Sequence, residues 1–571
     1  MGRTARPAWR RGYDAKSRRG GFIYTQAEGG RTGVAGLPPD PQLARPEPAL
    51  ADAEPAPQAV RLTPAWSRLA VLGAALVVLA GIVLRFWTRS DLWLDEALTV
   101  NIARLPLHRI PGALRRDGAP PLYYVLLHVW TAVFGTSDVA VRALSGAFGV
   151  AALPLMWLAG RRIGGPARGA ITGFAAVVLL ASSPFAVRYS TETRMYSLVV
   201  VLVLLGYLAL DRALGATAVR GGPLVAIALV TALLLYTHYW SLYLVAVVGG
   251  LLIVRAARAR GAGRTVTLGA LGALAAGGVL FVPWLPTLAF QLRHTGTPWA
   301  EPATFSAMVN AVSEFAGGRS SSGRALGLTF FALAGFGLLG AAIDGHRIEV
   351  DLRTRPWARR VAPVTAGTLA LAITVGLISR STFSSRYTSV VYPPFVLLVA
   401  LGVAVLADRR IRSGVLAAAA VFGLITCSLN VRTNRTQVGQ VAVALHARYQ
   451  PGDVVAYCPD QLGPSTSRLL GANVDQVSFP RRTPPQFVNW VDYSKVNGSA
   501  DPVSFANYLD HVAGPQHAVW MVWSPGYRTL RLACERINAQ LAALRPAASE
   551  VVALNAVKFY EHADLVRFAR R

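Results

Sequence analysis

The sequence predicts a mainly α-helical protein that crosses a membrane many times and ends in a small α/β domain. Its 571 residues are 53% hydrophobic and only 15% charged, and the mean hydropathy is +0.41. Apolar runs of roughly 17–22 residues, the length that crosses a bilayer, recur between residues 68 and 430. After residue 431 the runs become shorter and alternate with polar loops, which indicates a separate domain of mixed strands and helices.

The first 67 residues are predicted to form a disordered cytoplasmic tail. The first twenty carry seven basic side chains and no apolar core, and residues 20–62 are rich in Pro, Ala and Gly. Because no cleavable signal peptide is recognisable, we expect the first membrane span to act as the targeting signal. The preference for Arg over Lys and the abundance of Ala and Gly are typical of a GC-rich bacterial genome.

The membrane domain is expected over residues 68–430, with about eleven spans. If the basic tail is cytoplasmic, five arginine-rich loops also fall on the cytoplasmic side, as the positive-inside rule requires. These loops are 161–169, 211–222, 255–264, 345–360 and 408–413. The spans are predicted at 68–87, 139–160, 167–184, 195–211, 222–239, 241–257, 265–285, 325–343, 362–379, 387–407 and 412–430. The protein is then a multi-pass plasma-membrane protein whose last domain is extracytoplasmic.

Residues 120–135, PPLYYVLLHVWTAVFG, are apolar enough for a short span. Counting them as one would reverse every later loop and place the arginines outside. We therefore predict a helix in the outer interface, where Tyr123, Tyr124, His128 and Trp130 suit the aromatic belt.

The extracytoplasmic domain is expected over residues 431–571. GDVVAYCP (452–459) and AVWMVWSP (518–525) are typical of buried strands, and residues 468–472 and 527–544 of helices. Cys458 and Cys534 both lie in this domain, where an oxidising compartment permits a disulfide. Two buried free thiols are the alternative, and the pattern alone decides neither.

The net charge of +28 does not indicate a nucleic-acid partner. Basic residues are concentrated in the tail and in short loops, so the positive-inside rule explains them better than a binding surface does.

Polar and ionisable residues gather at the predicted outer ends of the spans. Such residues are costly at membrane depth and usually face a cavity or a partner, so their convergence predicts a site built from several loops. The sequence has no glycine-rich nucleotide-phosphate loop and no cluster of metal-ligating His or Cys. The segments are 91–97, 115–124, Arg142, 187–197, 236–243, 286–324 and 380–394.

These segments resemble the GT-C superfamily of glycosyltransferases, in the branch of the protein O-mannosyltransferases and lipid A aminoarabinose transferases. The resemblance extends over about residues 85–410 and depends on the order and spacing of several short motifs. They are W-x-D-E (Trp93, Asp95, Glu96), D-x-x-P-P-L-Y-Y (Asp117 to Tyr124), V-R-A-L-S (141–145), Y-S-x-E-x-R-M-Y (189–196), Y-T-H-Y (236–239) and S-R-Y (385–387).

The resemblance implies an extracytoplasmic transferase that takes a sugar from a polyprenyl-phosphate carrier. Its acceptor would be a protein, a glycan or a lipid. In the family, the acid that matches Asp95 is catalytic, and a further acid matches Glu192. The chain departs from the pattern at Ala119, where many members have His or Lys before the Pro-Pro pair.

The chemistry of glycosyl transfer gives these residues candidate roles. A base must take the proton of the acceptor hydroxyl, and Asp95 and Glu96 are the predicted catalytic carboxylates. The leaving phosphate gathers negative charge, for which Arg386 is the first candidate, with Arg194 or Arg380 as alternatives. The predicted substrate-binding residues are Asp117, Tyr123, Tyr124, Arg142, Tyr189, Glu192, Arg194, Tyr196, His238, Tyr239, Arg386 and Tyr387.

Each assignment has a plainer alternative. Asp95 and Glu96 would then be solvated loop acids, and His238 an interfacial hydrogen-bonding residue. Arg386 would anchor a helix end to lipid phosphates, and Glu192 with Arg194 would be a structural pair. No cofactor is predicted with certainty, and a weakly bound divalent cation on Asp95 or Glu96 stays open.

A transporter or flippase for a lipid or sugar is the alternative function. Such proteins typically have an internal repeat and helices broken at the bilayer midplane. The sequence shows no such repeat, and its polar residues gather on one side, so a transferase is favoured.

Overall fold

The computed structural model describes residues 66–296, 320–344, 346–379 and 384–569, with a few single residues between 304 and 317. The predicted tail lies outside the described residues except at its last two positions, and Arg380 also lies outside them.

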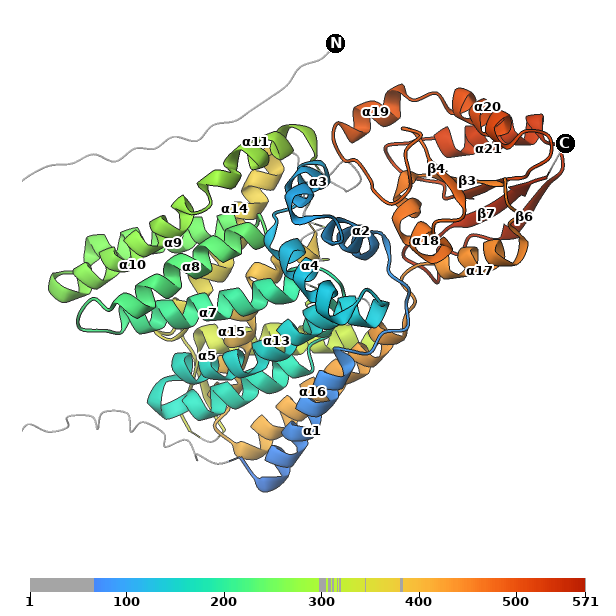
Figure 1. Ribbon diagram of the computed structural model, residues 1–571. Coiled ribbons are helices and arrows are strands. Elements are labelled where there is room, and N and C mark those ends of the chain that lie inside the picture. The colour runs from blue at the N-terminus through green and yellow to red at the C-terminus, as the bar shows by residue number, and fades with distance from the viewer. Residues whose placement is uncertain are drawn as a thin grey trace, which may run out of the picture. The chain divides into compact units, whose positions relative to one another are not determined.

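The first part of the chain is helical (Figure 1). Its α-helices are α1 (Arg68–Leu84), α2 (Leu94–Ala103), α3 (Ile110–Asp117), α4 (Leu122–Phe134), α5 (Asp138–Ala181), α6 (Pro184–Ser190), α7 (Tyr196–Leu214), α8 (Gly221–Thr237), α9 (Ser241–Arg258), α10 (Gly261–Val279), α11 (Leu285–His294), α13 (Ser321–Leu339), α14 (Ala362–Ser379), α15 (Tyr392–Val405) and α16 (Arg409–Arg432). Short 3-10 helices occur at η1 (Leu107–Arg109), η2 (Val282–Trp284), η3 (Ala358–Arg360) and η4 (Ser385–Val390), and a two-stranded hairpin joins β1 (Gly340–Ala342) to β2 (Ile348–Val350).

The helices agree with a multi-pass membrane protein, as the sequence predicts. Each of the eleven predicted spans overlaps a helix. Within the described residues, seven helical stretches are long and apolar enough to cross a membrane, and α1, α4, α8 and α15 are shorter apolar helices. The 44-residue α5 covers two predicted spans. Its backbone leaves the helical conformation at Gly165, where φ is 64°, a value that glycine adopts without strain.

The segment predicted to lie in the interface forms α4, which has 13 residues. At about 1.5 Å per residue this helix is shorter than the roughly 30 Å of a bilayer core. His128 Nδ1 is hydrogen-bonded to the carbonyl oxygen of Ala103 at 2.7 Å, and Trp130 Nε1 donates to the carbonyl oxygen of Ala140 at 2.8 Å. These bonds tie α4 to α2 and α5, whereas its depth in a membrane stays a prediction.

The centre of the helical domain is α15, in which every residue is buried. It packs mainly against α13 and α5. Glycines permit the close approach to α13, as small residues commonly do between membrane helices. A Cβ atom on Gly402 would lie 1.8 Å from the carbonyl oxygen of Leu333, and one on Gly337 would lie 2.2 Å from that of Leu398.

The C-terminal domain is a sheet of five strands between two helical layers. The strand order is β4-β3-β5-β7-β6, with β3 parallel to both β4 and β5, and β7 antiparallel to β5 and β6. Its elements are α17 (Val438–Arg448), β3 (Val454–Cys458), η5 (Asp460–Leu462), α18 (Gly463–Leu470), β4 (Asp475–Ser478), α19 (Tyr493–Ser499), α20 (Pro502–Ala513), β5 (Val519–Trp523), α21 (Ala533–Leu544), β6 (Ala548–Val552) and β7 (Asp564–Phe568).

Successive side chains of β3 point to opposite faces of the sheet, and each face is covered by a layer of helices. Val454 and Ala456 pack in one core with residues of α20 and α21, while Val455 and Tyr457 pack in another with residues of α17 and α18. The predicted strands at 452–459 and 518–525 are confirmed as β3 and β5. The strands β4, β6 and β7 are not among the predicted elements.

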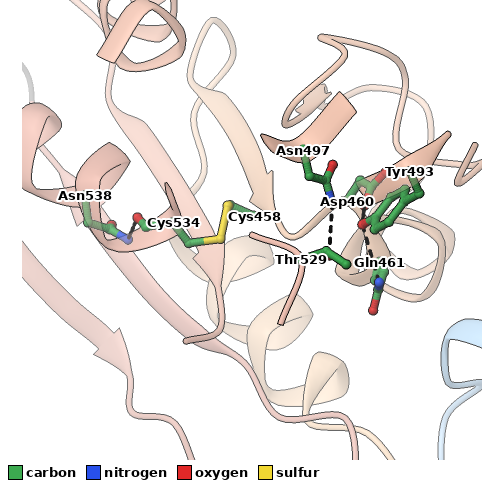
Figure 2. The surroundings of a disulfide bond; sticks show 8 residues. All are labelled: Cys458, Asp460, Gln461, Tyr493, Asn497, Thr529, Cys534 and Asn538. Atoms are coloured by element: carbon green, nitrogen blue, oxygen red, sulfur yellow. Dashed lines mark hydrogen bonds between the residues drawn. A yellow bond between two sulfur atoms is a disulfide. The ribbon is translucent and has the colours of Figure 1, made fainter. Parts of the chain in front are cut away.

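A disulfide joins Cys458, the last residue of β3, to Cys534 in α21, with the Cα atoms 5.5 Å apart (Figure 2). Of the two alternatives left open by the sequence, the structure has the bridge. Cys427 is a buried free thiol in α16.

The C-terminal domain contacts the helical domain around α2. Helix α18 packs against α2, next to which it lies in Figure 1. Arg468 forms an ion pair with Asp138 at 3.1 Å, and the backbone N–H of Trp490 donates to the carbonyl oxygen of Arg116 at 3.2 Å.

Candidate active site

Helix α2 presents both predicted catalytic acids in its first turn. Acidic side chains are favoured there because the unpaired N–H groups give a helix N-terminus a partial positive charge. Trp93 occupies the N-cap position without a side-chain cap bond. Its indole Nε1 instead donates to Glu192 Oε1 at 3.0 Å. Two of the predicted motifs, W-x-D-E and Y-S-x-E-x-R-M-Y, therefore meet at this bond.

Asp95 forms an ion pair with Arg386, whose guanidinium NH1 lies 2.5 Å from Asp95 Oδ2. The arginine comes from η4, 291 residues later in the chain. Both side chains keep some exposure, 17% for Asp95 and 13% for Arg386. The guanidinium also lies 5.9 Å from the ring centroid of Trp93 and 5.6 Å from that of Tyr387. The pair is thus partly open and backed by aromatic rings.

Glu96, in contrast, is fully buried. Arg142 of α5 donates to its carboxylate through Nε at 2.7 Å and NH2 at 2.6 Å, and the backbone N–H of Thr193 donates at 3.0 Å. A second arginine, Arg435, lies 3.8 Å away. Burial alone would raise the pKa of Glu96, but Arg142, with smaller contributions from Arg435 and Thr193, holds this pKa below its ordinary value. Glu96 is therefore an ionised group that joins α2 to α5.

A second polar network runs from Asp117 to the backbone of α2. Tyr124 donates its hydroxyl to Asp117 Oδ2 at 2.8 Å, and Arg194 NH1 donates to Tyr124 Oη at 3.3 Å and to Thr99 Oγ1 at 2.9 Å. The Thr99 hydroxyl donates to the carbonyl oxygen of Asp95 at 2.6 Å. Burial raises the pKa of Asp117, and the charge of Arg194 and the bond from Tyr124 oppose this rise.

Tyr123 joins the same region by another route. Its hydroxyl is 2.7 Å from Ser145 Oγ, which in turn donates to the carbonyl oxygen of Arg194 at 3.0 Å.

Four further predicted residues form a row of rings. Adjacent centroids along the row Tyr189, Tyr196, His238 and Tyr387 are 4.9, 5.8 and 5.4 Å apart. The row ends beside Arg386. Tyr239 has other partners: its hydroxyl donates to Gln291 and accepts a bond from Trp284 Nε1 at 3.0 Å.

A cavity of about 390 Å³ borders the ion pair on the side of Arg386, which lines it, whereas Asp95 is not among its lining residues. Its wall combines aromatic rings with charged groups, as binding sites for polar ligands commonly do. Three of the predicted site residues line it, Tyr189, Glu192 and Arg386, together with Trp93 of the W-x-D-E motif. The others include Phe185, Arg188, Glu314, Ser385 and Tyr560.

Three residues of the C-terminal domain contact this region and were not predicted: Arg435, Tyr560 and Glu561. Tyr560 lines the cavity, and its ring meets that of Trp93 edge-on with the centroids 5.5 Å apart. Glu561 accepts a hydrogen bond from the backbone N–H of Leu94 at 3.0 Å. These residues lie in irregular segments of the last domain, where no motif or periodicity marks them. Within the described parts of the chain, no three His, Cys, Asp or Glu side chains gather as metal ligands.

No protein-family model and no curated protein matches the sequence. Solved structures do match it. The crystal structure of ArnT from Cupriavidus metallidurans bound to undecaprenyl phosphate is similar over 88% of this chain and 99% of its own, with 14% sequence identity and a TM-score of 0.55. The crystal structure of ArnT in the apo state is similar over 88% of this chain and 98% of its own, with 13% sequence identity and a TM-score of 0.56. The chain has the GT-C fold. The Saccharomyces cerevisiae Pmt1-Pmt2 complex bound to its sugar donor matches 43% of this chain and 37% of its own, with 17% identity and a TM-score of only 0.31.

The GT-C fold agrees with the family resemblance of the short motifs. It also extends the likeness beyond the 85–410 region, because 88% of the chain aligns with ArnT. At this level of identity the likeness concerns the fold, so the activity has to be argued from the site itself.

Proposed function

We propose that the protein is a glycosyltransferase that moves a sugar from a polyprenyl-phosphate carrier to a hydroxyl group of an extracytoplasmic acceptor. The observation that carries this proposal is the pairing of Asp95 with Arg386 beside the cavity, on a membrane-embedded scaffold with the GT-C fold. The likeness to ArnT bound to undecaprenyl phosphate supports a lipid-linked donor. Whether the sugar is a hexose or a pentose is left to experiment.

Asp95 is the proposed base. Its carboxylate takes the proton of the acceptor hydroxyl as that oxygen attacks the anomeric carbon, and the bond from this carbon to the phosphate oxygen breaks. The bonding electron pair leaves with the lipid phosphate, which gains negative charge. Arg386 is the proposed group that balances this charge, because a guanidinium fork matches phosphate oxygens.

The Asp95–Arg386 ion pair connects these two roles. A donor phosphate would compete with Asp95 for the same guanidinium. As Arg386 binds the phosphate, the Asp95 carboxylate would be released from the ion pair and could accept the proton of the acceptor hydroxyl. Donor binding would thereby free the base that the reaction needs.

Glu96 has the supporting role in this scheme. Its contacts with Arg142 and Thr193 join α2 to α5 and to the segment before α7. Trp93, Tyr189, Glu192 and Tyr196 are proposed to surround the sugar or its phosphate. The network of Asp117, Tyr124 and Arg194 is proposed to hold the other side of α2.

The test uses full-length protein in lipid nanodiscs with a panel of radiolabelled polyprenyl-phosphate hexoses and pentoses. Protein, glycan and lipid fractions of a bacterial envelope serve separately as acceptors. We expect transfer of label from one donor class to one fraction, and transfer slower by roughly 100-fold or more with Asp95→Asn. Absence of transfer from every donor, or full transfer by Asp95→Asn, would contradict the proposal.

A further inference from the structure

The N-terminus of α2 lacks a cap from its own chain segment. The first N–H groups of a helix have no partner within the helix and are usually capped by a neighbouring Ser, Thr, Asp or Asn. Here Trp93 occupies that position and cannot serve. The helix start carries Asp95, so any movement of this turn also moves the proposed base.

Glu561 takes the place of the missing cap. Its carboxylate Oε1 accepts the N–H of Leu94 at 3.0 Å and the hydroxyl of Ser465 at 3.2 Å. Leu94 directly precedes Asp95, and Glu561 is 467 residues away in the chain. A negative or polar oxygen at this position also interacts favourably with the positive end of the helix dipole.

The backbone on both sides of Glu561 is firmly held. Its N–H donates to the carbonyl oxygen of Arg435 at 2.9 Å, and its own carbonyl accepts the N–H of Gln437 at 2.8 Å. Arg435 in turn donates to the carbonyl oxygen and the hydroxyl of Thr191 at 2.8 and 2.7 Å. None of these bonds involves the Glu561 side chain. We therefore expect them to remain after its substitution, so the carboxyl can be tested separately from the fold of the segment.

The preceding residue, Tyr560, reaches the cavity itself. Its ring packs edge-on against Trp93 and contributes to the cavity wall. Two consecutive residues of the C-terminal domain thus contact the N-terminus of α2 and the cavity that Arg386 lines. A contact that served only to hold the two domains together would not need to lie next to the ion-paired arginine.

We propose that Glu561 is a positioning residue of the active site, which caps α2 and so sets the place of Asp95 against Arg386. The C-terminal domain then contributes a residue that positions the proposed base. This inference depends on the proposed glycosyl transfer for its catalytic consequence but not for the cap itself. Burial raises the pKa of Glu561 to about 7. The protonated and ionised carboxyl groups both present an oxygen to Leu94, so Gln is a close mimic of Glu at this site.

The test compares Glu561→Ala with Glu561→Gln in full-length protein in nanodiscs. Hydrogen exchange with mass spectrometry follows the backbone N–H groups of residues 94–97, and steady-state kinetics follow the donor found by the panel. In Glu561→Ala we expect about tenfold faster exchange at these residues. We also expect kcat to fall about tenfold or more while KM for the donor stays within about threefold, because a misplaced base weakens the transition state more than it weakens binding. Glu561→Gln should restore both.

Asp453→Ala is the matched control. Asp453 is another buried acid of the C-terminal domain. Its carboxylate accepts hydrogen bonds from the backbone N–H of Ala518 and the indole Nε1 of Trp520, both in the same domain. Its substitution should lower the thermal stability of the domain without changing exchange at residues 94–97. Unchanged exchange in Glu561→Ala would overturn the proposal, as would a Glu561→Gln variant that loses as much turnover as Glu561→Ala. The exchange measurement needs no substrate, so a wild type that transfers no sugar would count against the proposed function and leave the cap to be decided by exchange.

Discussion

Asp95 and Glu96 are neighbours in the chain but lie in different surroundings. Consecutive residues of a helix point about 100° apart, so two adjacent acids reach different sides of α2. Asp95 is partly exposed and paired with Arg386, whereas Glu96 is fully buried between Arg142 and the backbone of Thr193. We therefore expect substitution of the first to affect activity and substitution of the second to affect stability.

Asp95→Asn should lower turnover by roughly 100-fold or more, within the usual range for loss of a general base. The amide keeps the size of the side chain but cannot accept a proton. Donor binding should remain largely intact, because the lost interaction matters mainly in the transition state. Kinetics and equilibrium binding of a polyprenyl-phosphate sugar measure the two effects. Near-normal turnover would remove Asp95 from the mechanism.

Glu96→Gln should destabilise the fold by about 3–5 kcal/mol, because it leaves the buried Arg142 without its charged partner. Replacing both residues, as in the double variant Glu96→Gln with Arg142→Met, should cost less than the two single changes combined. Thermal unfolding in nanodiscs measures these differences. A single variant as stable as the wild type would show that this ion pair does not hold α2 to α5.

The burial of Asp460 should make the stability of the C-terminal domain depend on pH. Its Oδ1 accepts the hydroxyl of Tyr493 at 2.5 Å (Figure 2), and burial raises its pKa from 3.8 to about 7. In the unfolded chain Asp460 ionises near its ordinary pKa of 3.8, whereas in the folded domain it keeps its proton up to about pH 7. The contribution to stability is therefore complete below about pH 3.8 and is lost as the pH rises to about 7.

Asp460→Asn should remove this contribution to the pH dependence, on the order of 3 kcal/mol between about pH 4 and pH 7. The variant would then lose less stability over that interval than the wild type. Calorimetric unfolding at several pH values compares them. Equal slopes in the two proteins would contradict a protonated Asp460 at neutral pH.

At the scale of elements, apolar run length predicts the helices of the membrane domain well. A span needs some twenty apolar residues in sequence, so the signal is local and strong. The W-x-D-E and S-R-Y motifs also lead to a real contact, since Asp95 meets Arg386.

Other features depend on distant partners that no local pattern encodes. Glu561 resembles any other acid of a polar loop until Leu94 is placed beside it. The strands β6 and β7 are not predicted for a related reason. Ala548–Val552 is exposed over its first three residues, and Asp564–Phe568, although as long as β3 and β5, carries charged residues among its apolar ones. The sequence likewise presents Asp95 and Glu96 as equivalent, and only their helical phase separates their surroundings.

The contact between α13 and α15 leads to a test with a matched control. Gly402→Ala adds a Cβ where the carbonyl oxygen of Leu333 would be 1.8 Å away, so the helices must separate. We expect a loss of about 1–3 kcal/mol, the usual cost of overpacking. Gly335→Ala also replaces a helical glycine, but its Cβ would meet nothing within 4 Å. It should therefore be neutral or slightly stabilising. Equal melting temperatures for the two variants would contradict the close packing of α13 on α15.

At the scale of the whole molecule, the proposed reaction requires one orientation. The site and the C-terminal domain lie at the same end of the helical domain, because Tyr560 packs against Trp93 and Glu561 accepts the N–H of Leu94 there. A polyprenyl-phosphate sugar used outside the cytoplasm would require this end to face outward. The arginine-rich loops at 161–169 and 255–264 would then face the cytoplasm.

Single cysteines can decide this orientation in intact cells. Cysteines introduced at Arg161 and Arg258 should react with an impermeant thiol reagent only after permeabilisation, and one introduced at Asn473 should react before it. All three positions are exposed in the structure, whereas Ser465 is buried beside α2 and would be a poor reporter. The native cysteines need not be removed, because Cys458 and Cys534 are bridged and Cys427 is buried. Each variant must react after permeabilisation to count as a valid reporter. Reaction of the Arg161 variant in intact cells would make α4 a true span and reverse the orientation of every later loop, and the C-terminal domain would then face the cytoplasm.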